Sequence, residues 1–408
     1  MRISDHTLNR LTVLKAILRH GPVARSDLPG LTGLSAGLIT LLTAELVDSE
    51  MVVEERVAGA GRGRPRVLLR INGQGAIVVG ASIDGMDGLR ASFVNLSGDL
   101  LHEVTATYGN HPTLTDLALR MGGALAEAID GSPFSREQIA RVGLALPAMV
   151  DSARGEVHFN TTFAVEPTPF AEPIAAIIGI PVTIENPLDC MARAAHWFGR
   201  ASADLDFTLI RVGFSVDSAE FANGVPKFGA NGLNPMFGHV KTETGDGARV
   251  CYCGMRGCMT AYASMYGMLE GAGELAGLPF PPLAELPGRF ADFIARAEAR
   301  EARALDAITQ AAQHFALALG NYVNVANPRV VYVSVDHPSF LPLLEGPVRA
   351  ALDQIVSPGI LPLTRIEFMQ TDYDWRWAGT AALALEQLYL EDSRNVRRTV
   401  RERTAVKA

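Results

Sequence analysis

The sequence predicts an α/β protein in which a small N-terminal winged helix-turn-helix module precedes a larger body of alternating strands and helices. Three observations predict this fold class. Apolar residues recur at helical spacing over the first 50 residues, and two short strand-like runs follow them. From residue 76 onward, strand-like and helical stretches alternate in two similar series. The chain has 408 residues, which is long for a single core, so two or three domains are expected.

The N-terminal module, residues 1–72, opens with a helix that Gly21-Pro22 ends. Ser26 can cap a second, short helix, and Ser35 can cap a third after a turn that contains Gly33. This layout is a helix-turn-helix, in which the helix that Ser35 opens enters the major groove of DNA. The buried side of this third helix is predicted to carry Leu38, Leu41, Leu42, Leu46 and Val47, and its outward side Ser35, Ala36, Gly37, Ile39, Thr40 and Thr43.

A basic loop follows the third helix. Two β-like runs, 51–57 and 66–71, flank the Gly/Pro-rich residues 58–65 and predict a hairpin wing. Its arginines can lie along a phosphate ridge or enter a narrow minor groove, whereas a solvated basic linker is the alternative. The outward side of the third helix lacks Arg, Asn and Gln, so small-residue contacts and this loop are expected to supply specificity. The predicted DNA-binding residues are Ser35, Ala36, Gly37, Thr40, Arg62, Arg64 and Arg66.

The body, residues 76–390, contains the alternating strands and helices, and a basic tail, 391–408, follows it. Strands are predicted at 76–83, 89–96, 101–108, 142–146, 182–185, 207–212, 218–221, 330–335 and 365–370. Helices are predicted at 113–129, 170–178, 341–355 and 375–389, with one long helical region around 291–325. Two similar α/β halves result. The tail is interpreted as a solvated or frayed helix.

Cysteine spacing predicts a metal site. Cys251, Cys253 and Cys258 lie within eight residues, and eleven residues separate His239 from the first of them. Three thiolates and one imidazole form a closed tetrahedral set, which is typical of structural Zn²⁺ and leaves no open position for catalysis. Three reduced thiols without a metal are the alternative. The remaining cysteine, Cys190, is interpreted as a buried, inert thiol.

Charge and hydropathy restrict the class of protein further. The net charge is −8, but residues 1–70 hold ten Lys/Arg against seven Asp/Glu, so the module is basic and the body acidic. Such a distribution favours a polyanionic partner for the module alone. The sequence contains neither an apolar run near the ~20 residues that span a bilayer nor a signal peptide, so a cytoplasmic protein is expected.

The cysteine motif resembles that of a known family. Gly238-His239 followed by Cys-x-Cys-Gly-x-x-Gly-Cys is similar to the zinc motif of the ROK family (repressors, open reading frames and sugar kinases). Residues 181–186, Pro-Val-Thr-Ile-Glu-Asn, and 229–232, Gly-Ala-Asn-Gly, resemble further family segments, and Gly63-Arg64-Pro65 resembles the wing of the family's sugar-operon repressors. The resemblance covers nearly the whole chain. It implies a duplicated actin-like, ribonuclease-H-like body behind the DNA-binding module.

The residues at the family's kinase positions are altered. Ser82–Gly88 and Gly213–Asp217 stand where the kinases have glycine-rich phosphate loops, and Ser334–His337 replaces the adenosine-side Gly-Gly-Gly. Bulky and acidic residues oppose the close backbone approach that phosphate binding needs. Pro187 stands where the family has its catalytic aspartate, and proline cannot accept a proton. We therefore expect no enzyme activity, and an ATP-dependent sugar kinase fused to a DNA-binding domain is the disfavoured alternative.

The effector site implied by the resemblance is also altered. Met236 and Thr260 replace two glutamates that bind sugar hydroxyls in the family, while Asn186 and His239 remain. Either an altered, sugar-like effector or loss of small-molecule binding fits these residues. The chain is expected to be a non-kinase transcriptional regulator, most simply a repressor, that binds a double-stranded DNA operator as a homodimer or homotetramer. An effector between the two halves, or a protein partner, would control it.

Overall fold

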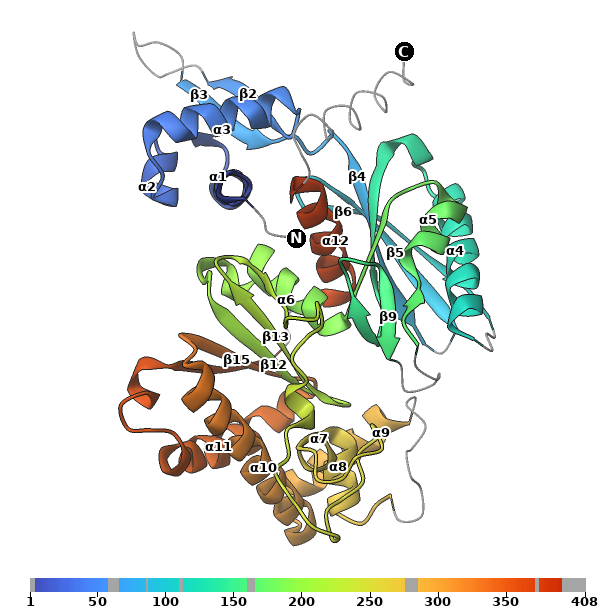
Figure 1. Cartoon of the computed structure of the whole chain (residues 1–408), viewed down its shortest axis with the longest axis vertical. Coiled ribbons are helices and arrows are strands. Elements are labelled where there is room, and N and C mark those ends of the chain that lie inside the picture. Colours follow the sequence, from blue (N-terminus) through green and yellow to red (C-terminus); the bar gives the residue numbers. More distant parts are fainter. Residues whose placement is uncertain are drawn as a thin grey trace. The chain divides into compact units, whose positions relative to one another are not determined.

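The computed structural model describes residues 4–57, 66–85, 87–109, 113–159, 166–275, 285–370 and 374–390, without the side chains of Val57, Phe159 and Trp375. The chain forms two compact units (Figure 1). The first unit holds the described residues up to 159, those from 166 to 197, and those from 375 onward. The second unit holds the described residues from 198 to 374. The predicted boundary between residues 72 and 76 falls inside the first unit, which groups the N-terminal module with the first half of the body.

The N-terminal module has the predicted winged helix-turn-helix arrangement. Its helices are α1 (Asp5–His20), α2 (Leu28–Thr32) and α3 (Ala36–Asp48), and its strands are β1 (Val23–Ala24), β2 (Val52–Val57) and β3 (Arg66–Ile71). The strands form one antiparallel sheet in the order β1-β3-β2, so the predicted hairpin is confirmed (Figure 1). The loop at 58–65, with Gly63-Arg64-Pro65, lies outside the described residues.

Capping residues explain where the module's helices begin. The Ser35 hydroxyl accepts the Leu38 N–H at 3.4 Å, which confirms Ser35 as the cap of α3. The prediction for Ser26 was wrong, because Asp27 precedes α2 and the Ser26 hydroxyl donates to its carboxylate at 3.0 Å. Gly33 follows α2 in the left-handed conformation, with φ at 72°, and ends that helix before the turn.

The outward and buried sides of α3 differ from prediction at three positions. Ile39 and Thr43 are buried, whereas Leu41 is 53% exposed. The buried stripe takes every third or fourth residue, Ile39, Leu42, Thr43 and Leu46, as one helix face requires. The polar Thr43 is tolerated there because its hydroxyl donates to the Ile39 carbonyl at 2.7 Å.

A five-stranded mixed sheet organises the rest of the first unit. Its order is β11-β7-β4-β5-β6. Strands β7 and β11 run parallel to β4, whereas β5 pairs antiparallel with both β4 and β6. The strands are β4 (Ile77–Asp84), β5 (Gly88–Asn95), β6 (Leu100–Thr107), β7 (Ile139–Ala145) and β11 (Val182–Glu185). A small antiparallel sheet, which the sequence did not predict, comprises β8 (Met149–Asp151), β9 (Glu156–Phe159) and β10 (Thr168–Pro169).

Helices α4 (Leu114–Asp130) and α5 (Ala171–Ile178) pack together, as do α6 (Pro187–Trp197) and α12 (Trp375–Leu390) (Figure 1). Helix α12 lies directly on β4 and β7, where the strands carry glycine. A Cβ at Gly143 would come within 2.3 Å of the Thr380 carbonyl oxygen. The missing side chain therefore allows α12 to pack closely against the sheet.

The second unit repeats the same strand order. Its sheet runs β14-β13-β12-β15-β16, with an antiparallel three-stranded part and two parallel strands, just as β6-β5-β4-β7-β11 does in the first unit. The strands are β12 (Phe207–Val212), β13 (Val216–Ala222), β14 (Val225–Lys227), β15 (Val330–Val335) and β16 (Arg365–Gln370). The predicted duplicated α/β body is thus confirmed.

The helices of the second unit enclose its main core. They are α7 (Thr260–Ala263), α8 (Met265–Gly271), α9 (Leu286–Glu298), α10 (Ala302–Ala326) and α11 (Leu341–Ile355). The helical region predicted around 291–325 comprises two helices, α9 and α10, and Arg300 between them has a positive φ of 66°. None of the described helices combines the length and apolarity needed to cross a bilayer.

Candidate functional site

The four predicted metal ligands converge in the second unit. The ligand atoms of His239, Cys251, Cys253 and Cys258 all lie within 4.8 Å of one another. Cys253 Sγ lies 3.8 Å from Cys258 Sγ, and His239 Nδ1 lies 3.6 Å from Cys251 Sγ. With Zn–S bonds of about 2.3 Å, the sulfurs of a tetrahedral site are about 3.8 Å apart. The cluster therefore has the size and the donor atoms of a tetrahedral metal centre.

Glycines allow the two segments of the cluster to approach each other. A Cβ at Gly238 would lie 1.9 Å from the Val216 carbonyl oxygen, and one at Gly257 would lie 2.0 Å from the Glu243 carbonyl oxygen. Gly257 also has a positive φ of 73°. The backbone around Cys258 pairs with Lys241, which joins the histidine and cysteine segments. A larger residue at either glycine would displace the residue that follows it, His239 or Cys258.

Burial favours the neutral forms of Cys251 and His239. Burial raises the pKa of the Cys251 thiol to about 12, so a thiolate there requires a positive charge nearby. Burial lowers the pKa of His239 and keeps its imidazole neutral, which is the form that binds a metal. A divalent ion with four protein ligands would crosslink residues 239–258 and would have no position left for a substrate.

Three further residues contact the ligands, and sequence reasoning missed all of them. Lys241 Nζ lies 3.0 Å from Cys258 Sγ, and the Tyr266 hydroxyl donates to Cys251 Sγ at 3.6 Å. The Tyr252 hydroxyl lies 3.2 Å from His239 Nε2. The second ring nitrogen of the histidine thus has a protein partner. The sequence could have indicated this partner, because Tyr252 stands between Cys251 and Cys253 in the motif.

The predicted effector residues have local structural contacts. Asn186 belongs to the first unit, where its Oδ1 accepts the Leu188 N–H at 2.8 Å and its Nδ2 donates to the Ala148 carbonyl at 3.1 Å. In the second unit, Met236 is 45% exposed. Thr260 is fully buried, and its Oγ1 lies 3.3 Å from the Val216 nitrogen. Asn186 therefore holds the start of α6, and Thr260 braces β13; their roles in effector binding stay predictions.

The altered phosphate loops of the second unit are filled by side chains. Arg211 donates two hydrogen bonds of 2.7 Å to the Asp336 carboxylate. A Cβ at Gly213 would come within 2.2 Å of that carboxylate, so Asp336 lies directly on the loop that the sequence predicts to replace the second phosphate loop. Ser215 donates to Asp217 in the same loop. A nucleotide phosphate at this loop would meet the carboxylates of Asp217 and Asp336.

The predicted DNA-binding residues of the described part are accessible. Ser35, Ala36, Gly37 and Thr40 are exposed at the start of α3. The Arg66 side chain is 69% exposed and lies 3.8 Å from the Asp27 carboxylate, too weak an ion pair to hold it. Arg62 and Arg64 lie outside the described residues.

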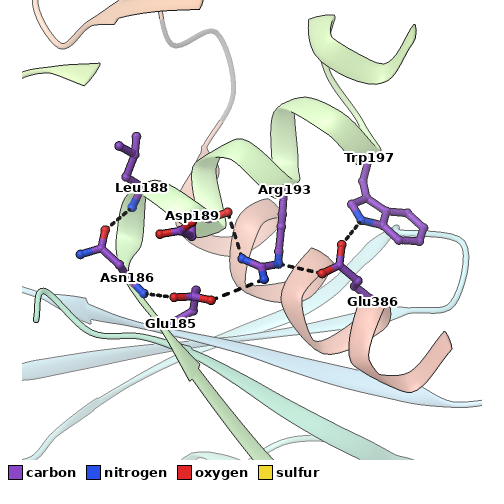
Figure 2. Close-up of polar contacts among 7 residues, drawn as sticks. All are labelled: Glu185, Asn186, Leu188, Asp189, Arg193, Trp197 and Glu386. Carbon is purple, nitrogen blue, oxygen red and sulfur yellow. Dashed lines mark hydrogen bonds and ion pairs between the residues drawn. The ribbon is translucent and has the colours of Figure 1, made fainter. Parts of the chain in front are cut away.

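A buried charged network, which the sequence did not indicate, lies next to Asn186 (Figure 2). Glu185 Oε1 accepts the Asn186 N–H at 2.9 Å, and its Oε2 lies 3.4 Å from an Arg193 nitrogen. Arg193 Nε donates to Glu386 Oε1 at 3.0 Å, and Trp197 Nε1 donates to Glu386 Oε2 at 3.2 Å. Burial raises the pKa of Glu185, while Arg193 opposes that rise. We call Glu185, Arg193, Trp197 and Glu386 the α6–α12 network.

Helix α1 of the N-terminal module contacts this network. Lys15 Nζ lies 2.8 Å from His196 Nε2 and 4.7 Å from the centre of the Trp197 ring. Arg10, on the same helix, donates to the Tyr389 carbonyl at 2.9 Å. The module is therefore attached to α6 and α12 by buried or partly buried polar contacts.

The stability of this attachment should depend on pH through Lys15. Burial lowers the pKa of its ammonium to about 8, although Glu386 opposes the shift. Between this value and the ordinary 10.5, the unfolded chain binds a proton that the folded chain lacks. The contribution of Lys15 to the free energy of unfolding therefore rises with pH across that window. In urea unfolding from about pH 7 to about pH 10, the free energy of unfolding of the wild type should rise relative to that of Lys15→Met. A difference between the two free energies that stays constant with pH would contradict this.

Comparisons with known proteins agree with this architecture. Residues 79–383 match the ROK family. The xylose repressor of Caldicellulosiruptor bescii is 24% identical over 86% of this chain and 90% of its own length. A crystal structure of a ROK family transcriptional regulator, described as a homologue of the Escherichia coli MLC protein, has 21% identity and a TM-score of 0.78 over 97% of this chain and 99% of that one. A ROK family glucokinase from Streptomyces griseus, with 20% identity and a TM-score of 0.60, matches over its full length but over only 76% of this chain. These likenesses show the actin-like fold of the body.

Proposed function

Because this chain belongs to the ROK family, we propose that it is a DNA-binding transcriptional regulator of ROK type. In this proposal it is a cytoplasmic protein that represses its target genes. The observation that supports this most is the N-terminal module. It combines a helix-turn-helix, a three-stranded wing and an accessible first turn on α3. The similarity to a xylose repressor extends over 86% of the chain.

The proposal includes the absence of kinase activity. Arg211 and Asp336 fill the loop around Gly213, and the resemblance implies that Pro187 stands where the family's kinases have their catalytic aspartate. A nucleotide would have to displace a bidentate ion pair and then approach carboxylates with its own negative charges. The actin-like body then serves for effector recognition and assembly rather than for phosphoryl transfer.

We further propose that Zn²⁺ occupies the Cys3His cluster as a structural ion. A sugar-like effector would contact Asn186, Met236, His239 and Thr260. The body, residues 76–390, would join two modules of residues 1–72 in a homodimer or homotetramer on a two-fold symmetric operator. The effector changes DNA affinity only to the extent that it binds one arrangement of the protein better than another.

In vitro selection tests the DNA-binding proposal. The purified, zinc-loaded full-length protein is used to select duplexes from a random pool. We expect enrichment of a palindromic or repeated motif whose half-sites lie one or two helical turns apart. The same preparation should release no ADP above background with ATP and a panel of hexoses. A pool that stays random, together with sugar-dependent ADP release, would overturn the proposal in favour of the kinase alternative.

A further inference from the structure

The α6–α12 network brings buried groups of opposite charge together. It holds two buried carboxylates, Glu185 and Glu386, around one guanidinium, that of Arg193. Buried ionic groups are costly unless their charges and hydrogen bonds are matched. The next positive charge comes from the N-terminal module, since Lys15 of α1 lies over Trp197 and interacts favourably with Glu386. The contacts of Lys15 and the arrangement of Trp197 and Glu386 therefore depend on each other.

The opposite end of the network is bonded to the backbone of the proposed effector segment. Glu185 precedes Asn186 in the chain and accepts its N–H. Asn186 in turn holds the first turn of α6 through Leu188, and Arg193 is on the same helix (Figure 2). A displacement of Asn186 would move the Glu185 carboxylate, and Arg193 would then redistribute its contacts between Glu185 and Glu386.

We propose that the α6–α12 network couples the Asn186 segment to helix α1, so that a change at Asn186 alters how firmly the DNA-binding module is held. This inference rests on the proposed function, in which Asn186 contacts the effector. Arg193 is the central positioning residue, because it pairs with both carboxylates. Coupling of this kind needs a connected set of contacts whose arrangement both ends influence.

A double-mutant cycle tests this without knowledge of the effector. The full-length protein is compared as wild type, Glu185→Gln, Lys15→Met and the double variant. The readout is the rate of amide hydrogen exchange in residues 5–20, which form α1. Gln keeps the size of Glu185 and its acceptor for the Asn186 N–H but removes the charge. We expect each single variant to speed exchange about three- to tenfold, and the double variant to exchange little faster than Lys15→Met alone.

Glu103→Gln is the matched control. Glu103 is also a carboxylate of the first unit that pairs with an arginine, Arg90, and accepts a hydrogen bond from Ser92. Its substitution should leave exchange in α1 unchanged, and its combination with Lys15→Met should be additive. Far-ultraviolet circular dichroism checks that every variant is folded.

The outcomes separate this inference from the proposed function. Non-additive exchange supports the coupling, even if the protein selects no DNA motif. If Glu185→Gln leaves α1 exchange at the wild-type rate, or if the two effects simply add, the coupling is overturned whatever the protein does with DNA. Should Glu185→Gln prove unfolded, Glu185→Asp, which keeps the charge but shortens the side chain, replaces it with the same two outcomes, because Glu185 is the carboxylate that accepts the Asn186 N–H.

Discussion

Cys258→Ser should abolish stoichiometric zinc binding and lower the unfolding midpoint of the full-length protein by roughly 10 °C or more. The reason is that structural zinc contributes about 10 kcal/mol or more in small domains, and each 1 kcal/mol corresponds to about 2–4 °C in domains of this size. Cys258 is fully buried, and its Sγ lies 3.8 Å from Cys253 Sγ within the cluster. A serine hydroxyl would not replace the thiolate there, because structural zinc sites of this kind bind sulfur and imidazole nitrogen. Elemental analysis and a thermal scan measure both effects.

Cys190→Ala is the control for this variant. Cys190 is equally buried, but it lies beside Ala145 and Leu383 in the first unit and outside the metal cluster. Its substitution should cost only about 1 kcal/mol of packing and leave one zinc per chain. If Cys258→Ser retained one zinc and the wild-type midpoint, the structural role of the cluster would be refuted.

Thr40→Glu should weaken binding to the selected duplex by about 100-fold or more. Thr40 is exposed near the start of α3, the part of a recognition helix that contacts base edges. A carboxylate there would face the negative charge of DNA and lose any contact of the threonine methyl group. Glutamate favours the helix more than threonine does, so folding should be preserved. Fluorescence anisotropy at fixed salt gives the two dissociation constants.

Ala44→Glu adds the same charge at an exposed position one turn further along α3. Since the early positions of the helix lie closest to the bases, we expect this control to lose less than about tenfold. Equal losses for the two variants would mean that α3 senses only the overall field of DNA. Wild-type affinity for Thr40→Glu would show that another surface carries the contact.

Regular segments were predictable because their sequence signals are local. The apolar runs at Val330–Val335 and Val182–Glu185 became buried parallel strands, and Ser35 became the cap of α3. The convergence of His239 with the three cysteines was also predicted, from their spacing. The separation of α9 from α10 had no such signal, because Arg300 adopts a positive φ that usually marks glycine or asparagine.

The contacts between distant segments could not be predicted. Glu185, Arg193 and Glu386 meet only because α12 returns to pack on the first sheet, almost 200 residues beyond α6. A buried charge looks like a surface charge in a sequence, and its partner is set by tertiary packing. The same holds for Lys15, whose position beside His196 is set by the packing of α1 on α6.

Affinity for the selected duplex relative to a scrambled one tests the central claim most directly. Full-length protein is titrated onto both duplexes at about 0.15 M salt, and each titration is repeated over a range of salt concentrations. Site-specific regulation predicts a selected site bound about 1,000-fold more tightly or better, with a scrambled site whose weak binding falls steeply with salt. Equal dissociation constants for the two duplexes would contradict the account.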